Sequence, residues 1–131
     1  MWQQNLALQG EPQTPPELMQ HLALQLIGGN GSAQPWRLTR GSEHWEGLPN
    51  GPLAANSPGL QREMAAHGLG IIGLDERMAR PWVERGLLQR ILPDWSLPSV
   101  TLWCVPPGRR LIPSRTTAFI ELLRAALVGE R

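Results

Sequence analysis

Asn56 and Ser57 are the polar residues whose types and position best suit the binding of an anion. They end a short apolar run and Pro58 follows them, so the pattern predicts a strand that passes directly into a helix. Free backbone amides, a hydroxyl group and the positive end of the helix dipole meet at such a point, which favours a carboxylate ligand. Ser57 can equally act as the helix N-cap, and one residue can do both. Ligand contact and simple capping therefore both remain open.

The run Gly68-Leu-Gly-Ile-Ile-Gly73 has the glycine spacing of dinucleotide-binding loops, and Asp94 follows about twenty residues further on. Such a loop needs a strand before the glycines and a helix inside them. Here a helix is predicted before Gly68, and the pair Ile71-Ile72 predicts a strand. We therefore favour a helix end that leads into a buried strand over a nucleotide site.

Other catalytic and metal-binding arrangements have less support. Ser57, His67 and Asp75 could be combined into a hydrolytic triad, but Ser57 and Asp75 are better explained as helix caps. The three histidines lack metal-ligand spacing, and the single cysteine, Cys104, lies in an apolar run. We expect Cys104 to be buried, the histidines to lie at helix ends and in loops, and the chain to use no metal, cofactor or catalytic residue.

The charge balance bears on the kind of partner. The 131 residues fit one domain and carry a formal charge of +1, from 12 basic and 11 acidic residues. Because basic and acidic residues are almost equal in number, we expect no basic surface that could bind phosphate groups. The chain alone is therefore not expected to bind DNA. No apolar run is long enough to span a bilayer, and one cysteine fits a reducing cytoplasm. Of the six tryptophans, three are expected inside packed elements: Trp36, Trp82 and Trp103. The other three are expected in loops or at chain ends: Trp2, Trp45 and Trp95.

These residues must be positioned by alternating helices and strands, the pattern of an α/β protein. Thr14 and Pro15 predict a short helix start, and Leu60, Met64 and Ala65 form an apolar stripe on the helix that begins at Pro58. Gly68 and Gly86 are placed to end helices in the left-handed conformation. Helices are predicted at 15–21, 58–67, 76–85 and from about 113; strands at 22–27, 36–39, 53–56, 69–74, 87–92 and 100–105; and a turn region at 47–52.

Several of these segments together resemble a known family. The order and spacing of Gly68-Leu-Gly-Ile-Ile72, Gly86–Trp95, Leu102–Arg110 and Ala118–Leu123 are similar to the end of a LysR-type transcriptional regulator. Leu6–Leu18 and Trp36-Arg-Leu38 extend the resemblance over nearly the whole chain. Two departures, Asp75 in place of a usual proline and Pro107-Gly108 in place of Pro-Ser, do not threaten the fold.

The resemblance implies a periplasmic-binding-protein type 2-like sensor of two α/β lobes. Residues 1–95 are then the second lobe, and residues 96–131 are the return crossover followed by the strand and C-terminal helix of an incomplete first lobe. A small-molecule effector, for which a carboxylate is one candidate, would lie in the cleft between lobes. The cleft positions that can be matched are Asn56, Ser57, Pro58, Ile72 and Thr101.

We therefore expect the effector-sensing part of a cytoplasmic LysR-type regulator, without most of its first lobe. A homo-oligomer is expected, and DNA would be bound only through a winged-helix module outside this sequence. An alternative is an interaction module, because residues 100–105 and the terminal helix need partners to bury their apolar faces. A small nucleotide-binding enzyme built on Gly68–Gly73 is the less favoured third reading.

Overall fold

The computed structural model describes residues 2–3, 10–51, 53–105 and 112–129. The chain divides into two compact units, residues 1–98 and residues 99–131. No helix in the described ranges is both long and apolar enough to cross a membrane.

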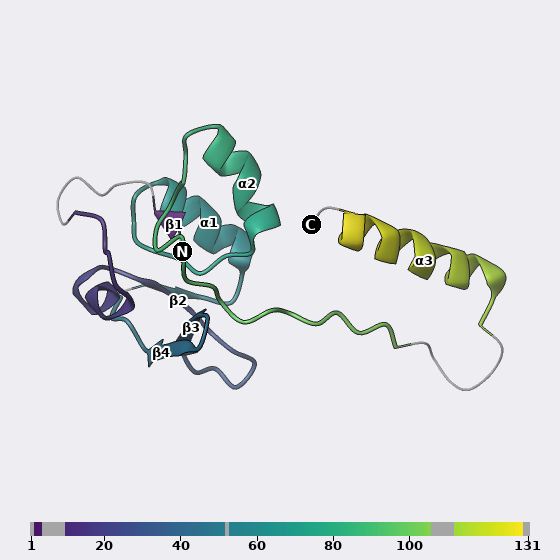
Figure 1. Ribbon diagram of the computed structural model, residues 1–131, viewed down its shortest axis with the longest axis horizontal. Helices are drawn as coiled ribbons and strands as arrows, with labels where there is room; N and C mark the ends of the chain where they lie inside the picture. The colour runs from purple at the N-terminus through teal and green to yellow at the C-terminus, as the bar shows by residue number, and fades with distance from the viewer. Residues whose placement is uncertain (1, 4–9, 52, 106–111, 130–131) are drawn as a thin grey trace. The chain divides into compact units, whose positions relative to one another are not determined.

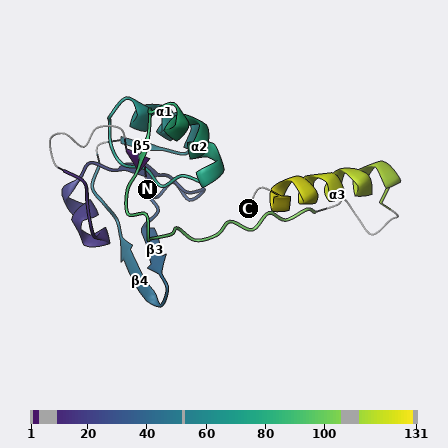
Figure 2. The same cartoon turned by 45° about the horizontal axis from the view of Figure 1, so that its top comes forward.

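The first unit is a mixed α/β structure built from three two-stranded sheets. In Figure 1, helices α1 and α2 lie on one side of strand β2, and the β3–β4 hairpin lies on the other. Figure 2 shows the same two helices and the hairpin at opposite ends of the unit. The elements in chain order are β1 (Trp2–Gln3), the 3-10 helix η1 (Pro15–Gln20), β2 (Leu24–Leu26), β3 (Trp36–Arg40), β4 (Glu43–Gly47), β5 (Leu53–Ala55), α1 (Pro58–Ala66), α2 (Glu76–Glu84) and β6 (Gln89–Arg90).

The central pair joins β2 to β5 in parallel, with Leu24 opposite Leu53. Ile71 adds a third segment, because its N–H donates to the carbonyl oxygen of Leu22 and its own carbonyl accepts from Leu24, both at 2.9 Å. The strand predicted over 69–74 is thus an extended segment with isolated bridges rather than a regular strand. Gly70, with a φ of 156°, approaches Leu22 too closely for any side chain.

Two hydrophobic clusters lie on either side of this segment. Ile71 belongs to the first and Ile72 to the second, and both side chains are fully buried. Neighbouring residues of an extended chain point in opposite directions, so the Ile pair serves both clusters. The first cluster also holds Leu18, Ala23, Trp36, Leu38, Ile91 and Leu92, and the second holds Leu24, Ala65, Ala66, Leu74, Ala79 and Leu88.

The helix boundaries confirm the signals read from the sequence. Ser57 and Asp75 are the N-caps of α1 and α2, and the Asp75 carboxylate accepts from the N–H of Arg77 at 2.9 Å. Gly68 and Gly86 follow the helices with φ values of 76° and 71°. The predicted stripe on α1 was wrong at Leu60, which is 52% exposed.

Four predictions of local structure need correction. The helix after Thr14 is a 3-10 helix, and the Thr14 hydroxyl donates to the Glu17 carboxylate instead of capping a backbone amide. Strand β4 was not predicted, because its charged residues Glu43 and Glu46 interrupt the alternation of apolar and polar residues that is typical of a strand. The strand predicted over 87–92 shortens to β6, which pairs with β1. Trp45, expected at a loop or end, lies in β4, while Trp95 lies in a loop as predicted, and both pack against the first cluster.

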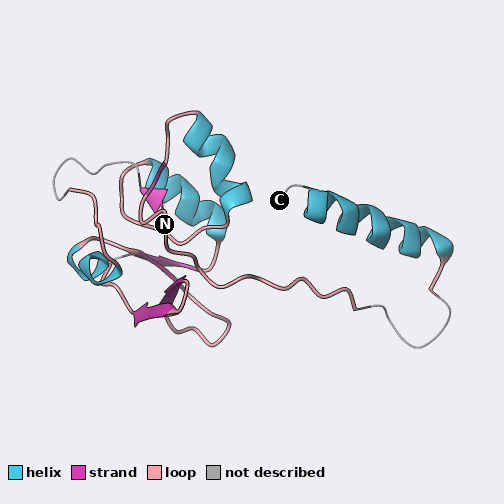
Figure 3. Ribbon diagram, in the orientation of Figure 1, coloured by secondary structure: helices cyan, strands magenta, loops and turns pink. Residues whose placement is uncertain are grey.

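In the described residues of the second unit there is one helix, α3 (Ser114–Gly129), which begins close to the predicted position. Figure 3 shows residues 99–105 as loop, so the strand predicted over 100–105 was wrong. A strand requires a hydrogen-bonded neighbour, and no described segment supplies one. Trp103 is consequently 84% exposed and Cys104 is exposed, against the prediction that both are packed. Pro107–Arg110 lie outside the described residues.

Candidate functional site

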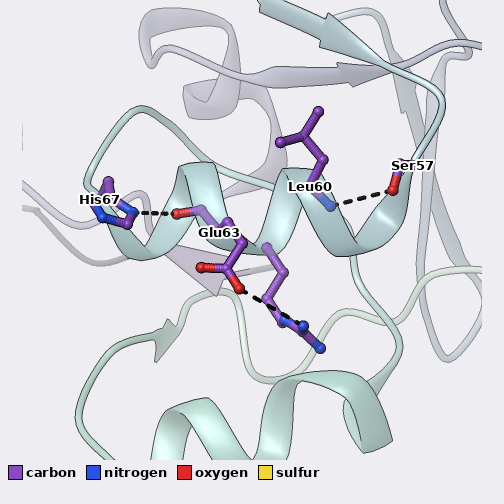
Figure 4. Close-up of polar contacts among 5 residues, drawn as sticks. Ser57, Leu60, Glu63 and His67 are labelled. Atoms are coloured by element: carbon purple, nitrogen blue, oxygen red, sulfur yellow. Dashed lines mark hydrogen bonds and ion pairs between the residues drawn. The ribbon is translucent and has the colours of Figure 1, made fainter.

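The predicted anion site lies at the start of α1. Asn56, Ser57 and Pro58 are all exposed there. The Ser57 hydroxyl oxygen accepts from the N–H of Leu60 at 3.3 Å, as Figure 4 shows. Capping is therefore confirmed for Ser57, while a second role in ligand contact stays a prediction.

The other two predicted site residues have different surroundings. The Ile72 side chain is fully buried in the second cluster, so only its backbone could meet a ligand. Thr101 is exposed and belongs to the second unit. Of the predicted site residues, the structure thus brings together Asn56, Ser57 and Pro58, which are consecutive at the exposed start of α1.

A pocket of about 270 Å³ opens in the first unit, one turn of α1 beyond Ser57. It lies between β2, the start of β3, helix α1 and the segment that follows Ser96. The sequence-predicted site residues do not line it, although Gly73, the neighbour of Ile72, does. The lining residues are Leu24, Leu26, Gln34, Pro35, Trp36, Arg37, Gln61, Gly73, Leu97 and Pro98.

Gln61 is the polar side chain that sequence reasoning missed. It is only 2% exposed, and its amide nitrogen donates to the carbonyl oxygen of Gln25 at 2.9 Å and more weakly to that of Leu24 at 3.5 Å. A buried polar group must be hydrogen-bonded, and these two carbonyls meet that need. The sequence did contain a signal for the burial of Gln61. It lies four residues before Ala65, and this spacing places both residues on the same, buried face of α1.

The lining holds one charged residue, and further charged groups lie beside it on the β3–β4 hairpin. Arg37 is the charged residue of the lining, and its Nε lies 2.9 Å from a carboxylate oxygen of Glu46. On the same hairpin, a 2.6 Å hydrogen bond with Glu43 raises the pKa of Arg40 and lowers that of Glu43. The Arg40 guanidinium also stacks 4.8 Å from the centre of the Trp95 ring. No Asp or Glu side chain is among the lining residues.

In the described part of the chain, the residues of the other candidate sites, namely the hydrolytic triad, the dinucleotide loop and a metal site, do not form such sites. Ser57 and His67 lie at opposite ends of α1, where His67 Nδ1 is 2.8 Å from the carbonyl oxygen of Glu63 (Figure 4). His21 ends η1, so the prediction that both histidines lie at helix ends is confirmed. A helix precedes Gly68 and extended chain follows it, which is not the order of a dinucleotide loop. In the described ranges, no three His, Cys, Asp or Glu residues are grouped as metal ligands.

The sequence model of the LysR substrate binding domain matches residues 3–128. The chain belongs to this family. One similar protein is an HTH-type transcriptional regulator of Xanthomonas campestris pv. campestris, 32% identical over 117 residues, which are 87% of this chain and 34% of the relative. The HTH-type transcriptional regulator PtxR of Pseudomonas aeruginosa is 32% identical over 120 residues, 88% of this chain and 38% of the relative.

Solved LysR-type structures agree with this assignment. The regulatory domain of AphB from Vibrio vulnificus superposes with a TM-score of 0.65 at 25% identity, covering 74% of this chain and 49% of that one. Full-length AphB of Vibrio cholerae, a virulence activator, gives the same TM-score at 27% identity, covering 74% and 33%. The periplasmic-binding-protein type 2-like α/β fold class is thereby confirmed. This LysR-family chain spans about a third of the length of the curated relatives it matches.

Proposed function

We propose that this chain is the effector-sensing part of a LysR-type transcriptional regulator. The observation that carries the proposal is the match to the LysR substrate binding domain over residues 3–128. The curated relatives are transcriptional regulators, and a pocket open to small molecules lies beside the start of α1. In this role the chain binds a ligand and performs no catalysis.

The proposal includes an assignment of lobes. Residues 1–95 form the second lobe, and residues 96–131 form the return crossover, the strand and the C-terminal helix of the first lobe. The division of the chain into compact units at residue 98 supports a boundary close to this position. Residues 100–105, which are loop here, would become a strand once first-lobe segments pair with them.

The effector would bind at the pocket and at the start of α1. Asn56, Ser57 and Pro58 are exposed at the end of α1 that carries the favourable dipole for an anion. Ile72 would contribute through its backbone, and Thr101 from the second unit. A ligand with greater affinity for one arrangement of lobes shifts the population toward it, which is how binding would reach the promoter.

Titration calorimetry of the chain against a metabolite library tests the site. For an effector with a carboxylate group, Asn56→Ala and Ser57→Ala should each weaken binding about fivefold, the equivalent of one lost hydrogen bond. Glu63→Ala on the same helix is the matched control and should leave affinity unchanged. Equal affinity in all variants would remove the α1 start from the site, and a library without any binder would argue against effector sensing itself.

The partners of the whole regulator form part of the proposal. We place DNA contact in a winged-helix module outside these residues, because the chain has a formal charge of only +1. A cytoplasmic homo-oligomer fits the family. The 131-residue chain should therefore show no retention of duplex DNA in filter binding at about physiological salt.

A second candidate function is an interaction module, and the exposed apolar residues of the second unit favour it. Side chains at 100, 102, 103 and 105 are more than two-thirds exposed, and none of the described residues of α3 is buried. Association with a second copy would cover this surface. Light scattering should then show a mass that rises with concentration, whereas a monomer at every concentration would eliminate this candidate.

A further inference from the structure

The wall of the pocket is mostly apolar, and this restricts the ligand it can accept. Leu24 and Trp36 come from the buried clusters, and Leu26 is 37% exposed at the end of β2. Pro35, Leu97 and Pro98 complete the apolar part of the lining. At about 270 Å³ the pocket is smaller than the usual range for drug-sized ligands, so a single ring or a short branched chain suits it.

The charges of the lining distinguish anions from cations. Arg37 is the charged member, and no carboxylate side chain accompanies it in the wall. Glu46 is paired with the Arg37 Nε atom, which leaves the guanidinium able to donate from its other nitrogens. A cationic ligand would lose hydration here, and among the lining residues it would meet the Arg37 guanidinium and no carboxylate, which is costly.

Gln61 adds a fixed hydrogen-bonding preference. Its amide nitrogen faces the carbonyl oxygens of Gln25 and Leu24, and a carbonyl cannot donate, so the amide can be oriented only with its N–H groups toward them. This leaves the oxygen of Gln61 as an acceptor on a side chain that is 2% exposed and lines the pocket. A ligand hydroxyl or amide N–H is the complementary group.

From these three features we infer that the pocket takes a neutral or anionic small molecule with an apolar body and one hydrogen-bond donor, and that Gln61 selects for the donor. This inference rests on the proposed effector-sensing function and specifies its ligand class. A hydroxylated aromatic or alicyclic acid has the required chemistry. Amines of the same size do not.

Three probes of equal ring size test the class: 4-hydroxybenzoate, benzoate and 4-hydroxybenzylamine, each titrated into the 131-residue chain. 4-Hydroxybenzoate should bind about tenfold more tightly than benzoate, because only it supplies the donor, and at least about tenfold more tightly than the amine. An amine that binds as tightly as the acid would overturn the class. So would benzoate and 4-hydroxybenzoate of equal affinity.

Two variants connect the probes to this pocket. Gln61→Leu should reduce the affinity for 4-hydroxybenzoate to that for benzoate. Leu26→Trp places a larger side chain in the pocket and should abolish binding of both acids, while Leu48→Trp, the same change at a 45% exposed leucine outside the lining, should not. Binding that survives Leu26→Trp would show that the pocket is not the site.

The outcomes also separate this inference from the function it rests on. A library compound of another class that raises the Tm, and loses this effect in Leu26→Trp, would disprove the ligand class and leave effector sensing intact. Failure of the probes together with every library compound to change the Tm would count against both.

Discussion

The side-chain amide of Gln61 donates to the backbone carbonyl oxygen of Gln25 at 2.9 Å, across 36 positions of sequence. This hydrogen bond fastens α1 to β2 in the wall of the pocket. Because the N-cap Ser57 lies four residues before Gln61, the same helix carries the exposed predicted site at its start and part of the pocket wall.

Removal of this bond should destabilise the fold. Gln61→Leu keeps the volume of the side chain but leaves the Gln25 carbonyl without this donor, so we expect a loss of about 1–2 kcal/mol in the free energy of unfolding. Urea denaturation followed by circular dichroism measures it. Leu60→Ala, at the exposed neighbouring position, should change stability by less than about 0.5 kcal/mol. Similar losses in both variants would show that the bond contributes little.

The two helix caps should differ in strength. Asp75 is charged and accepts from Arg77 N–H at 2.9 Å, whereas Ser57 is neutral and accepts from Leu60 N–H at 3.3 Å. We expect Asp75→Ala to cost about 1–2 kcal/mol and Ser57→Ala about 0.5–1 kcal/mol in denaturant titrations. Asp75→Asn and Ser57→Thr should retain most of the stability. The reverse order of the two alanine variants would contradict the assignment.

Gly51 should be among the least replaceable glycines. A Cβ atom at this position would lie 1.6 Å from the carbonyl oxygen of Ala23, and both atoms belong to the backbone or are fixed to it. Gly51→Ala should therefore cost more than about 3 kcal/mol or prevent folding. Gly29→Ala, where a Cβ meets nothing within 4 Å, is the control and should be nearly neutral. Thermal denaturation distinguishes the two, and a stable Gly51→Ala protein would refute this close approach.

Glu17 should titrate below its ordinary pKa of 4.5. The Gln13 N–H and then the Thr14 hydroxyl donate to the carboxylate, both at 2.9 Å, and so lower its pKa. A lowered carboxyl pKa stabilises the fold at pH values above 4.5, and the contribution is lost as the pH falls through the folded-state value. NMR titration of the side-chain carboxyl carbon measures the pKa, which Thr14→Val should raise. A value at or above 4.5 in the unaltered chain would be inconsistent with these bonds.

Cys104 should react freely with a thiol reagent in the folded chain. It is exposed, so its rate with Ellman's reagent should be close to that of the chain in urea. If a second copy covers residues 100–105, the rate should fall as the protein concentration rises. A thiol protected at every concentration would mean that this segment is packed within a single chain.

Local signals in the sequence predicted the features that local chemistry controls. Ser57, Asp75, Gly68 and Gly86 mark helix ends through hydrogen bonds or dihedral angles that involve only residues within one turn. The order and spacing of the segments along the chain were likewise enough to indicate the family, because they can be compared without a structure. The candidate residues Asn56, Ser57 and Pro58 were found together because they are consecutive.

The features that were missed depend on contacts between distant residues. Strand β4 exists because Trp45 packs on the core while its charged neighbours face water, and the tail from Val100 is loop because no described strand lies beside it. The strand and burial predictions for Trp103 and Cys104 followed from apolar composition, which does not supply a neighbour.

The sequence by itself determined the caps of α1 and α2, the glycines that follow these helices and the family, since each depends on short-range bonding or on the order of residues. Only the tertiary structure decided where the pocket lies and that Gln61 belongs to its wall. That wall draws residues from positions 24 to 98, and the burial of a polar side chain depends on which carbonyl groups the fold brings to it.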